Sequence, residues 1–307
     1  MPDNQESYYA HGKLLLTAEY FVLQGAKAIA LPVKYGQRMT VRSNDRENEL
    51  NWKAFTPDGL WFSCDLRLPD LEIIQSSDAE KAGILRDTLH TMQQLNPNFQ
   101  LSGGLEIHTT IDFDSQWGLG SSSTLVANLA SWADVDPFLL NEKIFNGSGF
   151  DIACASADGP IFYTKGEAVE SVKLDYPFID NLYFAYSGSK KSTRGEVRRF
   201  MNKGTVSSSE SDMINEITEQ MAQAKNLKEF QQLMVDHEKV VSGLLNMPTV
   251  KSSYFTDFDG EIKSLGAWGG DFYLVATTMN ESSVFQYFKA KGLHVIFPWK
   301  ELVLNNR

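Results

Sequence analysis

Cysteine is almost absent from this chain: only Cys64 and Cys154 occur among 307 residues. Two distant cysteines cannot build a disulfide framework, and they lack the close spacing of zinc ligands. The sequence also lacks the Walker A signature, so an ordinary P-loop is excluded. No apolar run approaches the length of a membrane span, and the polar residues 1–8 do not resemble a secretory signal. We therefore expect two free thiols in a soluble, cytoplasmic protein.

Positive charge is also scarce. Lys and Arg total 28 against 39 Asp and Glu, which gives a net charge of −11. Such a field repels nucleic acid and anionic membranes, so we expect neither as a partner. Any phosphorylated ligand must be held by local cations and metal. The 42% hydrophobic content indicates a folded globular chain, long enough for one large or two ordinary domains.

The first half of the chain is rich in strand patterns. We expect strands at residues 13–17, 20–23 and 28–33, and a further pair at 38–41 and 60–65 around the turn signal Thr56-Pro57-Asp58-Gly59. One helix is expected at residues 79–94, where apolar residues recur on one face.

The second half alternates strands and helices. Strands are expected near residues 161–163 and 182–185, followed by helices at 211–224 and 227–245. A strand at 271–277, a helix at 282–290 capped by Asn280 and a strand at 293–297 complete the chain. This order favours a ferredoxin-like α+β half, with the boundary between Tyr163 and Asn181.

The most informative stretch is Trp117-Gly118-Leu119-Gly120-Ser121-Ser122-Ser123-Thr124. Residues 105–113 alternate like a strand before it, and apolar residues recur at helical spacing after it. A helix that starts near Ser123 would direct its N–H groups at a bound anion, and the glycines would let phosphate approach the backbone. In isolation, the same residues also fit a flexible loop with a Ser or Thr cap.

Four other stretches carry candidate chemistry, each with an ordinary alternative. Lys13 could steer a phosphate or be a solvated lysine at a strand edge, and Glu19 could be a surface carboxylate. Asp151 could take a proton from a hydroxyl or cap a helix. Glu142 could bind Mg²⁺ or lie on a helix surface. The cations Lys190, Lys191, Arg194, Arg198 and Arg199 suit an anionic substrate or a solvated helix start.

Taken in order, these stretches resemble the GHMP kinase superfamily, named for galactokinase, homoserine kinase, mevalonate kinase and phosphomevalonate kinase. Residues 12–20 and 28–32 look like its first motif, Gly118-Leu119-Gly120-Ser121-Ser122 matches its phosphate loop, and Gly266-Ala267-Trp268-Gly269-Gly270 is similar to its third motif. Two positions depart from the pattern. Asp114 stands where proline is usual, and Trp268 stands where glycine is common and would crowd the turn.

The resemblance implies an α+β fold of two domains, 1–170 and 171–307. The first would be like domain 2 of ribosomal protein S5 and would bind ATP, and the second would be ferredoxin-like. It also implies roles for individual residues. Asp151 would be the catalytic aspartate with Lys13 close to it; the ATP phosphates would lie on Gly118, Leu119, Gly120, Ser121, Ser122 and Ser123; Mg²⁺ would lie on Ser122 and Glu142; and substrate would contact Glu19, Lys190, Lys191, Ser192, Thr193 and Arg194.

We therefore expect a kinase that uses ATP and Mg²⁺ to phosphorylate a small anionic metabolite. The motifs lean toward the mevalonate and phosphomevalonate kinases of isoprenoid synthesis. A sugar or homoserine-type kinase remains an alternative, as does an inactive regulator that binds nucleotide or metabolite. A homodimer is left open as the assembly.

Overall fold

The computed structural model describes residues 5–188 and 206–305, and the chain forms two compact units. The first unit comprises the chain up to Gly12, Tyr35–Ser115 and Leu119–Ser156. The second comprises Lys13–Lys34, Gln116–Gly118 and everything from Ala157 onward. Strands β1 (Glu6–Leu15) and β2 (Ala28–Asn44) contribute residues to both units. The expected boundary at residues 170 and 171 stays a prediction.

The first unit is built on a sheet with the strand order β5-β4-β3-β6-β2. Strands β3 and β6 run parallel, and the other neighbours in this part of the sheet are antiparallel. Leu50, Trp52 and Ala54 alternate along β3 and enter the core, as a half-buried strand requires. The strands not yet bounded are β3 (Glu49–Thr56), β4 (Gly59–Arg67), β5 (Glu72–Ser76) and β6 (Gly104–Ile111).

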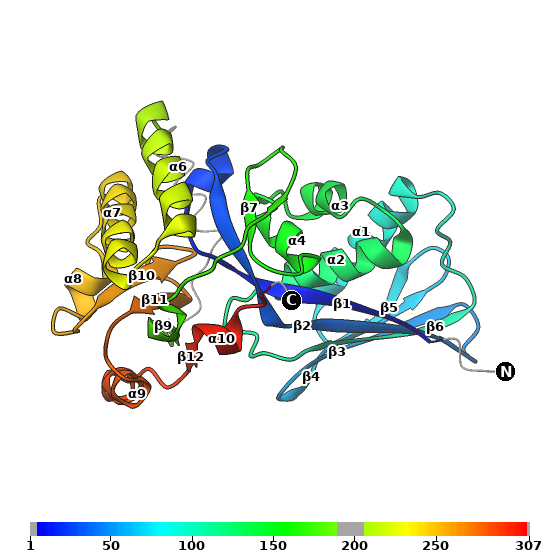
Figure 1. Cartoon of the computed structure of the whole chain (residues 1–307). Coiled ribbons are helices and arrows are strands. Elements are labelled where there is room, and N and C mark those ends of the chain that lie inside the picture. Colours follow the sequence, from blue (N-terminus) through cyan, green and yellow to red (C-terminus); the bar gives the residue numbers. More distant parts are fainter. Residues whose placement is uncertain (1–4, 189–205, 306–307) are drawn as a thin grey trace. The chain divides into compact units, whose positions relative to one another are not determined.

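Four helices cover one face of this sheet (Figure 1). They are α1 (Ala79–Leu95), α2 (Ser121–Ala133), α3 (Pro137–Ile144) and α4 (Phe150–Ala155). Asp78 caps α1 by accepting from the Lys81 N–H, and Asp136 caps α3 in the same way, so each start follows from a local side chain. Apolar residues of α1, α2 and α3 share one core with the strands.

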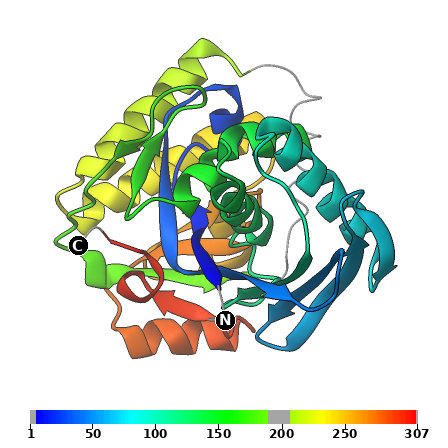
Figure 2. The same ribbon diagram turned by 90° about the vertical axis from the view of Figure 1, so that its right-hand side faces the viewer.

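The second unit contains an antiparallel sheet with the strand order β10-β11-β9-β12. Helices α6 and α7 pack side by side, as Figures 1 and 2 both show, and α7 contacts β10 and β11. Val284 and Phe288 of α9 pack with Tyr183 and Tyr273 of the strands. The bounds are β9 (Leu182–Tyr186), β10 (Glu261–Leu265), β11 (Phe272–Ala276), β12 (Ile296–Pro298), α6 (Ser208–Gln223), α7 (Leu227–Leu245), α8 (Val250–Tyr254), α9 (Glu281–Ala290) and α10 (Trp299–Leu302).

Shorter elements complete the second unit. Strand β7 (Ile161–Tyr163) pairs with the beginning of β2, and β8 (Glu170–Ser171) pairs with β7. Two 3-10 turns, η1 (Phe21–Gln24) and η2 (Ile179–Asn181), precede β2 and β9. Among the described helices, none combines the length and apolarity needed to cross a bilayer.

Two sequence expectations are wrong. Residues 20–23 were expected as a strand, but Phe21–Gln24 form η1, and Tyr20 before it has a φ of 68°. Tertiary hydrogen bonds hold this stretch, which local pattern cannot reveal. Strand β4 pairs with β3 rather than with residues 38–41, which lie in β2 beside β6. The expected helices at 79–94 and 227–245 are confirmed as α1 and α7.

Candidate functional site

The start of helix α2 has the features of an anion site. Gly120 is the N-cap, with a φ of 93° that a residue with a side chain rarely adopts. The Ser123 hydroxyl donates to the Gly120 carbonyl at 2.8 Å, and the Thr124 N–H donates to the same oxygen at 3.0 Å. Ser123 is buried, whereas Ser122 is exposed. The first-turn N–H groups and the positive end of the helix dipole therefore favour an anion beside an exposed hydroxyl.

Buried hydrogen bonds fix α2 to strand β2. The Thr124 hydroxyl donates to Gln37 Oε1 at 3.0 Å, and the Asn128 amide donates to the Gln37 carbonyl at 2.9 Å. Gln37, Thr124 and Asn128 are all buried. Because buried polar groups that are fully paired resist displacement, they hold the helix start in one position. Gln37 was not predicted as part of this site. Thr124 and Asn128, a polar pair at i and i+4 on an apolar helix, indicate that a buried polar partner is present.

Asp151 lies in the first turn of α4. The N-cap of this helix is Gly149, with a φ of 91°, so the alternative of Asp151 as the cap does not hold. Its Oδ1 accepts the Ile152 N–H at 3.2 Å, and the side chain is half-buried. Helix α4 packs against both α2 and α3. A carboxylate at this position can accept a proton from a hydroxyl.

Glu142 lies exposed on α3, the helix that packs against α2. Across residues 5–188 and 206–305, no group of three or more His, Cys, Asp or Glu side chains could hold a metal ion. Mg²⁺ usually takes one or two protein oxygens and completes its shell with water and substrate phosphates. The exposed Ser122 hydroxyl and Glu142 carboxylate are oxygen donors of the kind it uses, so these residue types fit the metal.

Residues 116–118, which begin the glycine loop, are held by side chains of the second unit. The Tyr186 hydroxyl donates to the Gln116 carbonyl at 3.0 Å, and the Trp117 ring meets Phe297 edge to face at 5.3 Å. The Lys13 amine donates to the Gly118 carbonyl at 2.8 Å. Lys13 is therefore half-buried and bonded to the loop backbone rather than simply solvated at a strand edge.

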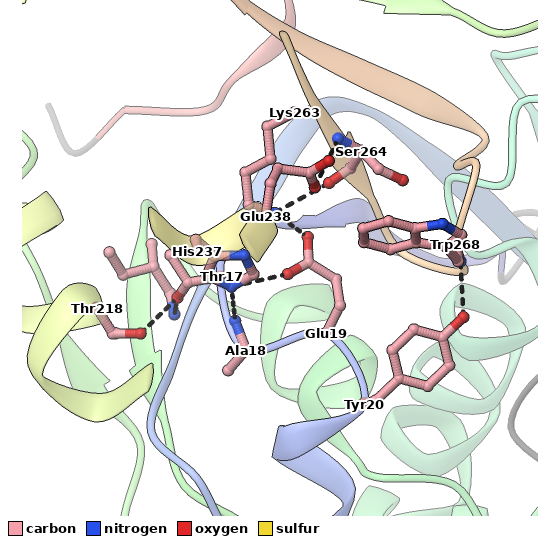
Figure 3. A network of polar contacts seen from close by, with 11 residues as sticks. Thr17, Ala18, Glu19, Tyr20, Thr218, His237, Glu238, Lys263, Ser264 and Trp268 are labelled. Carbon is pink, nitrogen blue, oxygen red and sulfur yellow. Dashed lines mark hydrogen bonds and ion pairs between the residues drawn. The ribbon is translucent and has the colours of Figure 1, made fainter. Parts of the chain in front are cut away.

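Glu19 belongs to a buried polar network in the second unit (Figure 3). Its Oε1 pairs with the Lys263 amine, and its Oε2 lies 3.1 Å from His237 Nε2. Glu238 Oε1 accepts the Ser264 N–H at 3.2 Å. The four ionisable side chains are Glu19, His237, Glu238 and Lys263, and each is at least 96% buried. This placement excludes the alternative of Glu19 as a surface carboxylate.

A backbone hydrogen bond identifies the acceptor nitrogen of His237. The Ala18 N–H donates to His237 Nε2 at 2.9 Å, so this nitrogen acts as an acceptor. Burial, together with the Lys263 charge, holds the pKa of His237 well below its usual value. Burial outweighs the attraction of Lys263 and raises the pKa of Glu19.

The network holds an unusual backbone in place. Ala18 and Tyr20 flank Glu19, and both have positive φ values, of 64° and 68°. Such residues persist only where their surroundings fix them. His237 Nε2 accepts the Ala18 N–H, and the Tyr20 hydroxyl accepts the backbone N–H of Trp268 at 2.7 Å. The stretch that resembles the first motif is thus fixed by His237 of α7 and by Trp268, which belongs to the stretch that resembles the third.

Trp268 was expected to crowd the turn of the third motif. The structure buries it at 8% exposure, and its indole N–H donates to the Pro248 carbonyl at 3.3 Å. The turn accommodates it through left-handed glycines on both sides, at Gly266, Gly269 and Gly270. Trp268 thus has a packing role within the second unit.

The expected substrate residues Lys190, Lys191, Ser192, Thr193 and Arg194 lie outside the described residues. Within the first unit, the structure brings together the helices that carry Ser121, Ser122, Ser123, Glu142 and Asp151. Within the second unit, Lys13 donates a hydrogen bond to Gly118, and Glu19 forms an ion pair with Lys263. The roles of these residues toward ligands stay predictions.

No family model matches the sequence, and no curated protein matches it. Solved structures do match. A Lin0012 protein from Listeria innocua has a TM-score of 0.72 at 18% identity, over 96% of this chain and 97% of that one. The mevalonate kinase of Methanococcus jannaschii has a TM-score of 0.71 at 16% identity, with the same coverage.

A third match is the phosphomevalonate kinase of Streptococcus pneumoniae, solved with phosphomevalonate and AMPPNP. Its TM-score is 0.69 at 16% identity, over 97% of this chain and 98% of that one. The likeness extends over almost the whole of each chain. The expected α+β fold of the GHMP kinases is therefore confirmed, and these identities establish the fold alone.

Proposed function

We propose that this chain is an ATP-dependent small-molecule kinase of the GHMP superfamily. The observation that carries the proposal is the start of α2, where a left-handed glycine precedes unpaired helix N–H groups and an exposed Ser122. A phosphate chain suits this arrangement. The shared fold adds support, because one protein with this fold was solved with the ATP analogue AMPPNP.

The proposed reaction moves the γ-phosphoryl group of ATP to a small anionic acceptor. The acceptor oxygen forms a bond to the γ-phosphorus while the bond from that phosphorus to the β,γ-bridging oxygen breaks, and ADP leaves. When the acceptor is a hydroxyl, its proton goes to the Asp151 carboxylate. When the acceptor is a phosphate, its attacking oxygen carries no proton, and none passes to Asp151. Catalysis is then mainly positioning and charge neutralisation.

Other residues of the chain take supporting roles in this proposal. Leu119, Gly120 and the serines 121–123 present backbone N–H groups to the phosphates. Lys13 supplies positive charge for the transferring group. Ser122 and Glu142 would hold Mg²⁺, which neutralises phosphate charge when bound. We propose mevalonate or phosphomevalonate as the acceptor, on the ordered motifs and on fold neighbours that are kinases of these names.

The test measures ADP release from Mg·ATP with mevalonate, phosphomevalonate, galactose and homoserine. We expect one of the first two to stimulate it. If mevalonate is the acceptor, Asp151→Asn should lower kcat by about 10²-fold or more, the range for a positioned base, while ATP affinity is kept. The matched control Asp158→Asn changes an exposed aspartate and should leave kcat unchanged. If ATP binds but none of these acceptors or other anionic metabolites releases ADP, the binding regulator replaces the kinase.

A further inference from the structure

Asp271 lies directly against the first glycine of the loop. A Cβ atom built on Gly118 would fall 1.9 Å from Asp271 Oδ2 and 2.4 Å from its Cγ. Both distances are far below van der Waals contact, so glycine is required here for reasons of space. Gly118 also has a φ of 69°, which favours glycine independently. The Asp271 carboxylate thus occupies the space that a side chain at residue 118 would need.

The carbonyl group of Gly118 is held by Lys13. Its amine donates to the Gly118 carbonyl at 2.8 Å. A trans peptide group is planar, and its carbonyl oxygen and N–H point in opposite directions. Fixing the Gly118 carbonyl on Lys13 therefore also fixes the direction of the Leu119 N–H.

Asp271 is well placed to act as a rigid support. It follows Gly269 and Gly270, immediately before the fully buried strand β11. Its own carbonyl accepts the Ser187 N–H at 2.9 Å, and the Gly270 N–H closes the preceding turn onto the Ala267 carbonyl at 2.7 Å. The side chain therefore projects from a backbone that is fixed on both sides.

We propose that Asp271 is a positioning residue for the glycine loop. Its carboxylate packs against Gly118 and, together with Lys13, holds the peptide between Gly118 and Leu119 so that its N–H is presented to an anion. A carboxylate repels phosphate, so its role lies in supporting the backbone rather than in touching the ligand. The inference rests on the proposed function, because the anion is the phosphate chain of a nucleoside triphosphate.

The experiment compares Asp271→Ala, which removes the support, with Asp271→Asn, which keeps its size. Hydrogen exchange of the peptide 116–123 is measured first, without nucleotide. We expect the Ala variant to exchange about tenfold faster there and the Asn variant to exchange like the wild type. Asp175→Ala, at an exposed aspartate of the same unit, is the control and should change nothing.

The second readout is the affinity for Mg·ATP, measured by titration calorimetry. The Ala variant should bind about tenfold more weakly, a loss of about 1.4 kcal/mol, and the Asn variant should bind like the wild type. In turnover, the KM for ATP should rise while the KM for the acceptor stays constant. A general loss of structure would raise both KM values.

The outcomes separate the two proposals. Unchanged exchange of residues 116–123 in Asp271→Ala overturns this inference, whether or not the protein binds ATP. Faster exchange with unchanged ATP affinity overturns it as well. A wild-type protein that binds no nucleotide overturns the proposed function, and with it the ligand assigned here, even if the exchange result shows that Asp271 supports the loop.

Discussion

Replacing Glu238 by Gln should change how stability depends on pH. Glu238 lies on α7 in the buried network, and its Oε1 accepts the Ser264 N–H. Burial is the main cause that raises its pKa from 4.5 to about 7; Lys263 opposes this shift and Glu19 adds to it. Such a shift corresponds to about 3 kcal/mol.

The direction follows from proton binding. Below pH 4.5 the Glu238 carboxyl is protonated in both the folded and the unfolded protein. Its contribution to the unfolding free energy, measured relative to high pH, is then fully present. Between pH 4.5 and 7 the unfolded chain releases the proton while the folded protein keeps it, and this contribution to stability is lost. Above pH 7 about 3 kcal/mol has been lost. Gln cannot titrate, so the Glu238→Gln variant avoids this loss.

The assay is urea unfolding of wild type and Glu238→Gln at pH 5 and pH 8. The difference in unfolding free energy should move by about 2.5 kcal/mol in favour of Gln at the higher pH, because the unfolded chain has already released part of the proton at pH 5. Comparing the two pH values removes any constant effect of the amide. Glu301→Gln, at an exposed position, is the control and should give parallel profiles. Parallel profiles for Glu238→Gln would refute the protonated, buried carboxyl.

Three further predictions concern the loop and the strained stretch. Gly118→Ala should lower the free energy of unfolding by about 2–4 kcal/mol, because it adds a clash with Asp271 to the strain of a positive φ. The control is Gly103→Ala, at a φ of 74° in open space, which should cost about 1–2 kcal/mol. Both are measured by urea unfolding. Equal costs would contradict the clash. Tyr20→Phe should cost about 1–3 kcal/mol by thermal unfolding, because the buried Trp268 N–H loses its acceptor, and an unchanged melting temperature would contradict this. Lys13→Met should lower kcat/KM for ATP at least tenfold, a loss of about 1.4 kcal/mol, in steady-state assays, and an active variant would exclude the lysine from charge neutralisation.

Local patterns were sufficient where an element depends mainly on its own residues. Helix α7 was predicted at residues 227–245 because its apolar spacing is regular, and the structure shows that Asn226 caps it. Strand β3 was missed although Leu50, Trp52 and Ala54 alternate, so its signal was present in the sequence. The stretch before η1 could not be predicted, because Ala18 and Tyr20 depend on partners more than 200 residues away.

The candidate site divides in the same way. The glycine loop, the start of α2 and Asp151 were found from residue types in sequence order. The partner of Glu19 was not, because Lys263 is 244 residues away and lies in a strand whose pattern does not mark a buried cation. Asp271 was predicted only as the first residue of a strand. Its contact with Gly118 depends on how the chain returns to this point, which no local pattern contains.

The central claim is that the loop before α2 binds the phosphates of ATP. Calorimetric titration of Mg·ATP into the wild type, Gly120→Val and Gly25→Val tests it most directly. Gly120 and Gly25 have φ values of 93° and 90°, so both valines introduce the same backbone strain. We expect binding by the wild type and Gly25→Val and none by a folded Gly120→Val. Equal affinity in all three proteins, or no binding by the wild type, would contradict it.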